Sequence, residues 1–182
     1  MPVIPYLPAD IEEPRELVTA IRARRGGTLL NLDRMLLHSP PFAAAWNAFL
    51  GGVRQTLDAP SKLRELAICV VALLNDAEYE FIQHGPEFLK AGGTGEQLEW
   101  LKNLPELNAP AGLFNPAEYA IIRLTCEMTR NIHVSPATAD AVLAELDSPQ
   151  HYTEIVGVIA TYNMVSRYLV AMGIEPEGRE KS

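Results

Sequence analysis

The stretch SKLRELAICVVALLNDAEYEFIQHGPEFLKAGG, residues 61–93, decides the fold. Within it, residues 66–74 are apolar on every side, which predicts a helix buried at the centre of the protein. Asn and Asp at positions 75–76 interrupt this helix. A second helix is expected over about residues 77–91, because the two glycines at 92–93 end it. The two helices are expected to pack as an antiparallel hairpin.

The rest of the sequence has the same helical character. Proline and glycine punctuate it, and no alternating strand pattern flanked by hairpin turns occurs. Further helices are expected over about residues 10–24, 31–38, 115–131, 135–146 and 149–172, with others opening at the prolines at 40–41 and at residue 94. The fold class is therefore predicted to be all-α, a bundle of about eight or nine helices with the hairpin at its centre.

The domain organisation is expected to be simple. A length of 182 residues suits one domain, and a hydrophobic share of 48% is enough for a sizeable core. Prolines at positions 2, 5 and 8 predict an extended arm over residues 1–9. The polar residues 175–182 are expected to form a flexible tail. We thus predict a single helical domain over residues 1–182.

Charge and hydropathy exclude two classes of partner. The net charge is −8 and no long basic run occurs, so a nucleic-acid partner is not expected. The longest strongly apolar run, residues 66–74, is too short to cross a bilayer, so no membrane partner is expected either. The first residues lack the features of an export signal, which predicts a cytoplasmic protein. Cys69 and Cys126 lie far apart in helical patterns and are expected to be buried thiols.

Polar residues on the hairpin form the candidate site. Glu65 stands at the edge of the apolar run, where an antiparallel hairpin brings it opposite the later part of the second helix. There, Glu80 and His84 are four residues apart and share one face, and Tyr79 lies in the adjacent row. Glu65, Glu80 and His84 are therefore predicted to converge in one pocket. Tyr79 is a candidate for substrate binding beside them.

Such a group has three chemical interpretations. An imidazole beside a carboxylate can move protons near neutral pH. Two carboxylates and one imidazole can also hold a divalent metal, although three scattered ligands are a weak signature. In the third interpretation, Glu80 and His84 form an ordinary surface pair of the helix, and Glu65 pairs with a cation such as Arg64.

The hairpin also resembles a known family. The segment LRELAI at residues 63–68, EYE at 78–80, His84 and AG at 91–92 resemble the carboxymuconolactone decarboxylase and alkylhydroperoxidase D-like superfamily, over about residues 40–130. Redox members of this superfamily carry a glutamate, two cysteines and a histidine in the frame Glu-x11-Cys-x2-Cys-x3-His. The same frame falls here on Glu65, Ala77, Glu80 and His84, so both cysteines are missing.

The resemblance implies an activity without thiols. Decarboxylase members also lack the cysteine pair and act on small carboxylated lactones without a metal or organic cofactor. By that resemblance, His84 is the candidate acid or base, Glu65 or Glu80 orients it, and Arg167 is a candidate partner for the substrate carboxylate. The expected function is thus a cofactor-free acid–base enzyme on a small organic acid or lactone.

Two alternatives remain open at this point. One is a ligand-binding or scaffold protein that catalyses nothing, and the other is residual alkylhydroperoxidase activity, which would have to depend on Cys69. The resemblance further implies self-association as a dimer, trimer or hexamer.

Overall fold

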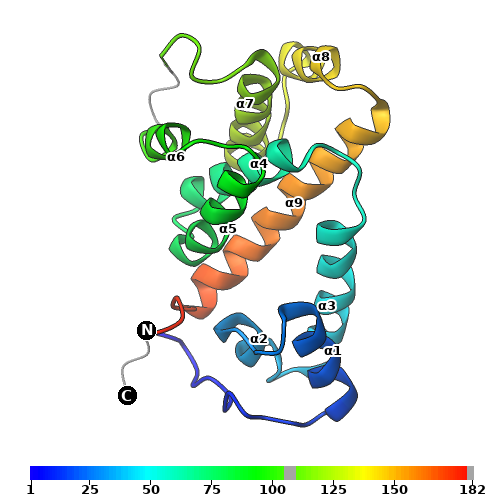
Figure 1. Ribbon diagram of the computed structural model, residues 1–182, viewed down its shortest axis with the longest axis vertical. Coiled ribbons are helices and arrows are strands. Elements are labelled where there is room, and N and C mark those ends of the chain that lie inside the picture. Colours follow the sequence, from blue (N-terminus) through cyan, green and yellow to red (C-terminus); the bar gives the residue numbers. More distant parts are fainter. Residues whose placement is uncertain (105–109, 180–182) are drawn as a thin grey trace. The chain divides into compact units, whose positions relative to one another are not determined.

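The computed structural model describes residues 1–104 and 110–179, and their regular structure is entirely helical (Figure 1). The prediction of an all-α protein with nine or so helices is confirmed for these residues. The chain divides into two compact units: unit 1 consists of Met1–Leu57 with Leu169–Ser182, and unit 2 is Asp58–Tyr168. The expectation of a single domain over residues 1–182 stays a prediction.

Unit 1 contains three complete helices, α1 (Arg15–Arg25), α2 (Asn31–Leu36) and α3 (Pro40–Gln55). The N-terminal arm lies along α2 of its own chain. There Arg34 donates from Nε to the carbonyl of Leu7 at 2.5 Å, and its guanidinium stacks over the ring of Tyr6. The tail meets the same arm, because the amide of Glu175 donates to the hydroxyl of Tyr6 at 2.8 Å. Residues 180–182 of the expected flexible tail lie outside the described residues.

The first helix begins later than the sequence predicted. Residue 10 was the expected start, whereas α1 begins at Arg15 with Pro14 at its N-cap. A proline disfavours helical geometry in the residue before it, so the helix cannot extend back through Pro14. The residues ahead of it instead bond to Arg22, whose Nη2 atom donates to the carbonyls of Ala9 and Ile11.

Unit 2 contains the predicted hairpin, formed by α4 (Ser61–Leu74) and α5 (Glu78–Lys90). The turn is tight. The amide of Ala77 donates to the carbonyl of Ala72 at 2.8 Å, and Asp76 adopts a left-handed conformation with φ 52°. This pattern is the Schellman end of a helix, in which the residue after the cap reverses the chain. Such a reversal sends α5 back along α4.

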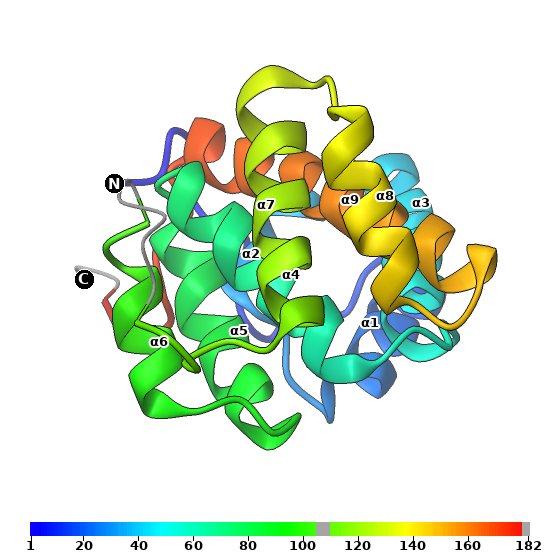
Figure 2. The same ribbon diagram turned by 90° about the horizontal axis from the view of Figure 1, so that it is seen from above.

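Around the hairpin lie α6 (Gly95–Leu101), α7 (Pro116–Asn131), α8 (Pro136–Glu145) and the larger part of α9 (Pro149–Met172). The side chains of Thr94, Asn115 and Ser135 cap α6, α7 and α8, because each accepts a backbone N–H of the following helix. The expected caps Asn31 and Ser61 instead lie inside α2 and α4. Figure 2 shows α7 beside α4 and α8 beside α7, and both pairs are in contact.

A buried core and one buried carboxylate fix the hairpin within unit 2. The core cluster draws residues from α4, α5, α6 and α7: Leu66, Cys69, Val70, Phe88, Leu101, Leu104, Phe114, Ile122 and Cys126. Glu118 of α7 accepts from Lys62 Nζ at 2.5 Å and from Gln97 Nε2 at 3.0 Å. One carboxylate therefore joins the start of α4 to α6 and α7.

The longest helix, α9, has the length and mean hydropathy of a membrane span. Polar residues such as Asn163 and Arg167 interrupt its apolar residues, so no long apolar run marks this helix in the sequence. A core helix of a soluble protein has the same composition, and 44% of the apolar window of α9 is buried inside the protein. Ile155, Val158 and Ile159 of this helix are fully buried.

Candidate functional site

Glu65 and His84 meet across the hairpin in unit 2. The Nδ1 atom of His84 on α5 lies 2.6 Å from Oε2 of Glu65 on α4, a hydrogen bond between the two side chains. His84 is 5% exposed and Glu65 is 18% exposed. Because a carboxylate bonded to one ring nitrogen fixes the orientation and tautomer of an imidazole, Glu65 is placed to orient His84.

The aromatic ring of Tyr162 covers His84. Their ring centroids are 4.9 Å apart and the planes cross at 83°, an edge-to-face contact. Tyr162 comes from α9 and is buried. The sequence left the place of this residue open, although a signal existed: Ile155, Ile159 and Tyr162 follow helical spacing and share the buried face of α9.

Glu80 lies in the same helix as His84, one turn earlier, and is 2% exposed. Neither of its carboxyl oxygens has a hydrogen-bond partner within the described part of the chain. Burial raises the pKa of Glu80 well above its ordinary value, because an apolar environment disfavours the charged form. The surroundings of Glu80 thus favour its neutral, protonated form. The interpretation of Glu80 and His84 as a surface pair is wrong, since both are buried.

Cys69 lies on α4, one turn after Glu65, and is fully buried. Burial raises the pKa of its thiol, and the nearby carboxyl groups, chiefly that of Glu65, raise it further. Because the thiolate is the reactive form of cysteine, this environment suppresses thiol chemistry. Cys69 and Cys126 are both free and buried, as predicted.

The two candidate substrate-binding residues lie in different surroundings. Tyr79 is 5% exposed on α5. Arg167 on α9 is exposed, and its Nη1 atom donates to the carbonyl and to the side-chain oxygen of Asn163, at 2.8 and 2.6 Å. The N–H donors on Nε and Nη2 of this guanidinium are the ones with which a substrate carboxylate would bond.

Asn163 is a structural residue that fastens α9 to the hairpin. Its side-chain oxygen accepts from Asn75 Nδ2 at 3.1 Å, and its amide donates to the hydroxyl of Thr129 at 3.0 Å. Asn75 also donates to Ser166 Oγ at 2.7 Å. The end of α4, α7 and α9 are therefore held together, which keeps Tyr162 against His84.

No group of three or more His, Cys, Asp and Glu side chains in residues 1–104 and 110–179 has the arrangement of a metal site. The three candidates are instead a bonded pair and a separate buried acid. Glu65 binds His84, whereas Glu80 is buried in surroundings that raise its pKa. We therefore do not assign a metal to them.

Residues 40–101 match the family described as "CMD: Carboxymuconolactone decarboxylase family". Over these residues the chain is similar to the carboxymuconolactone decarboxylase family. Glu65, Glu80 and His84 all lie within this carboxymuconolactone decarboxylase segment. The comparison with curated proteins gave no match.

Solved structures similar to this chain share the fold of that family. An uncharacterized peroxidase-related protein from Silicibacter sp. TM1040 has a TM-score of 0.76 at 17% identity, covering 97% of this chain and 91% of its own. An alkylhydroperoxidase AhpD core protein from Ralstonia eutropha JMP134 has a TM-score of 0.75 at 17% identity, covering 94% and 87%. The prediction of an alkylhydroperoxidase D-like fold is confirmed.

A third similar structure holds a small ring compound. It is a variant of the debrominase Bmp8 in complex with 2,3,4-tribromopyrrole, with a TM-score of 0.78 at 16% identity, covering 98% of this chain and 95% of its own. At these identities the likeness concerns the fold alone.

Proposed function

We propose that this protein is a cofactor-free acid–base enzyme that acts on a small organic acid or lactone. The observation that carries the proposal is the 2.6 Å hydrogen bond between His84 Nδ1 and Glu65 Oε2 at a nearly buried position. A histidine oriented by a carboxylate is the commonest proton-transfer device in enzymes. The family segment that contains both residues supports the same chemistry.

The proposed roles follow from the geometry. In the proposed mechanism Glu65 accepts a hydrogen bond from Nδ1–H of His84. The other ring nitrogen, Nε2, is then the one that exchanges a proton with the substrate. In a decarboxylation, the bond between the carboxylate and the adjacent carbon breaks, carbon dioxide leaves and the electron pair stays on that carbon as an enolate. His84 then protonates the carbon and regains its proton from water. The same nitrogen can activate water for the opening of a lactone ring.

Glu80 has a separate proposed role in this chemistry. A neutral carboxylic acid can donate a hydrogen bond to an oxygen that becomes negative in the transition state. Its neutrality also leaves Glu65 as the single negative charge beside His84 within this group of three. If Glu80 were ionised, its negative charge would repel the negative charge that develops on the substrate in the transition state.

Thiol peroxidase activity is the weaker alternative. The frame positions that carry cysteines in redox members hold Ala77 and Glu80 here. The remaining nearby thiol, that of Cys69, is buried, and its pKa is raised by burial and by two carboxyl groups. Two-electron reduction of a peroxide needs a thiolate and a second thiol to resolve it, and this site supplies neither.

The proposal is tested with a panel of small carboxylated lactones and β-keto acids. Released carbon dioxide and ring-opened products are measured for the wild type and for His84→Ala. We expect turnover to fall by about 10²–10⁴-fold in His84→Ala, the usual contribution of a general acid or base. Far-ultraviolet circular dichroism checks that the variant is still folded.

The scaffold alternative makes the opposite prediction for the same variant. If the protein only binds a ligand, His84→Ala changes stability and leaves any background conversion unaltered. Self-association is a further proposal taken from the family resemblance, and light scattering coupled to size-exclusion chromatography tests it. A monomer at micromolar concentration would contradict it.

A further inference from the structure

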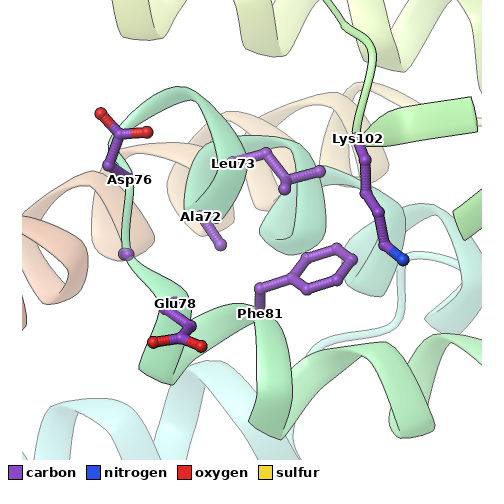
Figure 3. Close-up of a pocket in the computed structure, with 7 residues that line it drawn as sticks. Ala72, Leu73, Asp76, Glu78, Phe81 and Lys102 are labelled. Atoms are coloured by element: carbon purple, nitrogen blue, oxygen red, sulfur yellow. The ribbon is translucent and has the colours of Figure 1, made fainter. Parts of the chain in front are cut away.

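A pocket of about 290 Å³ lies beside the turn between α4 and α5 in unit 2 (Figure 3). Its lining comes from the end of α4, the turn, the start of α5 and the residue that follows α6. Neither Glu65 nor His84 is part of this lining. Phe81 is the wall residue nearest to His84 along α5 and precedes it by three residues. The pocket wall thus approaches the acid–base pair but does not include it.

The wall of the pocket is largely apolar. Leu73 and Phe81 line it, and both are half-buried because they pack against the core cluster of unit 2. Their remaining exposed surface faces a space large enough for a small molecule. An engineered cavity of about 150 Å³ already holds benzene, so 290 Å³ accommodates one ring with a substituent.

Charged side chains mark two ends of the pocket. In Figure 3, Asp76 lies at one end and its carboxylate points away from the ring of Phe81, whereas Lys102 descends beside that ring from the other end. The ammonium of Lys102 pairs with Glu99 at 2.6 Å, and these side chains are 50% and 72% exposed. An exposed pair of this kind stabilises by less than about 1 kcal/mol, so a ligand carboxylate can replace Glu99.

We propose that this pocket binds a small carboxylic acid with a single apolar ring. The ring lies on Leu73 and Phe81, and the carboxylate bonds to Lys102. The lining also contains the acids Asp76 and Glu78, and Lys102 is its single cation. An apolar wall with a few polar groups is the usual composition of a small-molecule site. The inference goes beyond the proposed function and does not depend on it, because the site is defined without Glu65, Glu80 or His84.

Benzoate is the probe for this site. We titrate it into the full chain and follow backbone amide chemical shifts by NMR. The expected shifts cluster at Leu73, Phe81 and the turn between α4 and α5. In Lys102→Met the dissociation constant of benzoate rises about fivefold, the effect of removing one partly exposed charge pair.

Lys90→Met is the matched control. Lys90 forms an ion pair with Glu87 at the same i,i+3 spacing, 2.7 Å long, and does not line the pocket. Lys90→Met changes the net charge by the same amount as Lys102→Met, and we expect it to leave the dissociation constant of benzoate unaltered. An equal weakening in Lys90→Met and Lys102→Met would show a general charge effect and overturn the proposal.

Two analogues test the assignment of the carboxylate. Benzyl alcohol keeps the ring without a charge, and its binding is expected to be insensitive to Lys102→Met. Benzylamine carries a positive charge and is expected to bind more weakly than benzoate. Tighter binding of benzylamine, or no shift at the pocket with benzoate at millimolar concentration, would overturn the proposal. Either result leaves the acid–base function untouched, because that function is read from turnover.

Discussion

His84 Nδ1 and Glu65 Oε2 lie 2.6 Å apart although the two residues are 19 positions apart in the chain. The contact exists because the reversal at Asp76 returns α5 along α4, so that the later part of α5 meets the earlier part of α4. Neither helix alone contains the site. A change that moves α5 by one residue along α4 separates the pair.

The first prediction concerns Glu65→Gln. Glutamine preserves the shape of the side chain but removes the negative charge that stabilises a protonated imidazole. We expect kcat to fall by about a hundredfold with little change in KM, because the loss affects proton transfer rather than binding. Glu87→Gln, at an acid on α5 whose side chain is 39% exposed, is the control and should retain wild-type kinetics. A rise in KM alone would assign Glu65 to binding.

Glu80→Gln is expected to change the pH dependence of stability. Because burial raises the pKa of Glu80, the native state holds a proton that the unfolded state releases between the ordinary and the raised pKa. The free energy of unfolding of the wild type therefore falls as the pH rises through this window. Glutamine cannot ionise, so the decrease that begins above the ordinary pKa of glutamate should be smaller in the variant. Urea unfolding at several pH values measures the two slopes, and identical slopes would contradict a raised pKa of Glu80.

Cys69 is expected to be unreactive in the native protein. Its thiol is fully buried and burial raises its pKa, so the thiolate fraction near neutral pH is very small. Iodoacetamide followed by mass spectrometry should label Cys69 only after urea is added. Cys69→Ser should consume added peroxide at the same rate as the wild type. A peroxide consumption that disappears with Cys69 would restore the thiol peroxidase alternative.

Glu127→Gln should loosen the start of α8. The hydroxyl of Thr138 and the amide of Ser135 bond to this carboxylate at 2.6 and 2.7 Å, and these bonds hold the pKa of Glu127 below its ordinary value. These two bonds add to the free energy of unfolding at pH values above the ordinary pKa of glutamate. The added stability is lost as the pH falls through the lowered pKa of Glu127. We expect a loss of about 1 kcal/mol near neutral pH that vanishes in acid. Glu145→Gln, on the exposed side of α8, is the control in the same thermal unfolding series.

Gly93→Ala should destabilise the link between α5 and α6. A Cβ atom at this position would overlap the ring of Phe88, which is fully buried in the core cluster. Relief requires movement of a packed aromatic ring, which costs about 1–3 kcal/mol. A Cβ at Gly95 would meet nothing within 4 Å, so Gly95→Ala should be close to neutral. Urea midpoints of the two variants provide the comparison.

The local sequence predicted most helices correctly. A side chain that caps a helix bonds to a backbone N–H two or three residues later, so the signal is local. Thr94, Asn115 and Ser135 therefore indicated the starts of α6, α7 and α8. The start of α1 was predicted wrongly. The helix was expected from residue 10 but begins at Arg15, because Pro14 disfavours helical geometry in the residue before it.

The sequence by itself determined that the protein is helical, that α4 is buried and that Glu65 and His84 can face each other across a hairpin. These follow from the spacing of apolar, glycine and proline residues, which is a local property of the chain. Only the tertiary structure decided which carboxylate bonds to His84, that Tyr162 covers this histidine and that burial raises the pKa of Glu80. Desolvation depends on every element packed around a group, and residues from α4, α5 and α9 meet here only after folding.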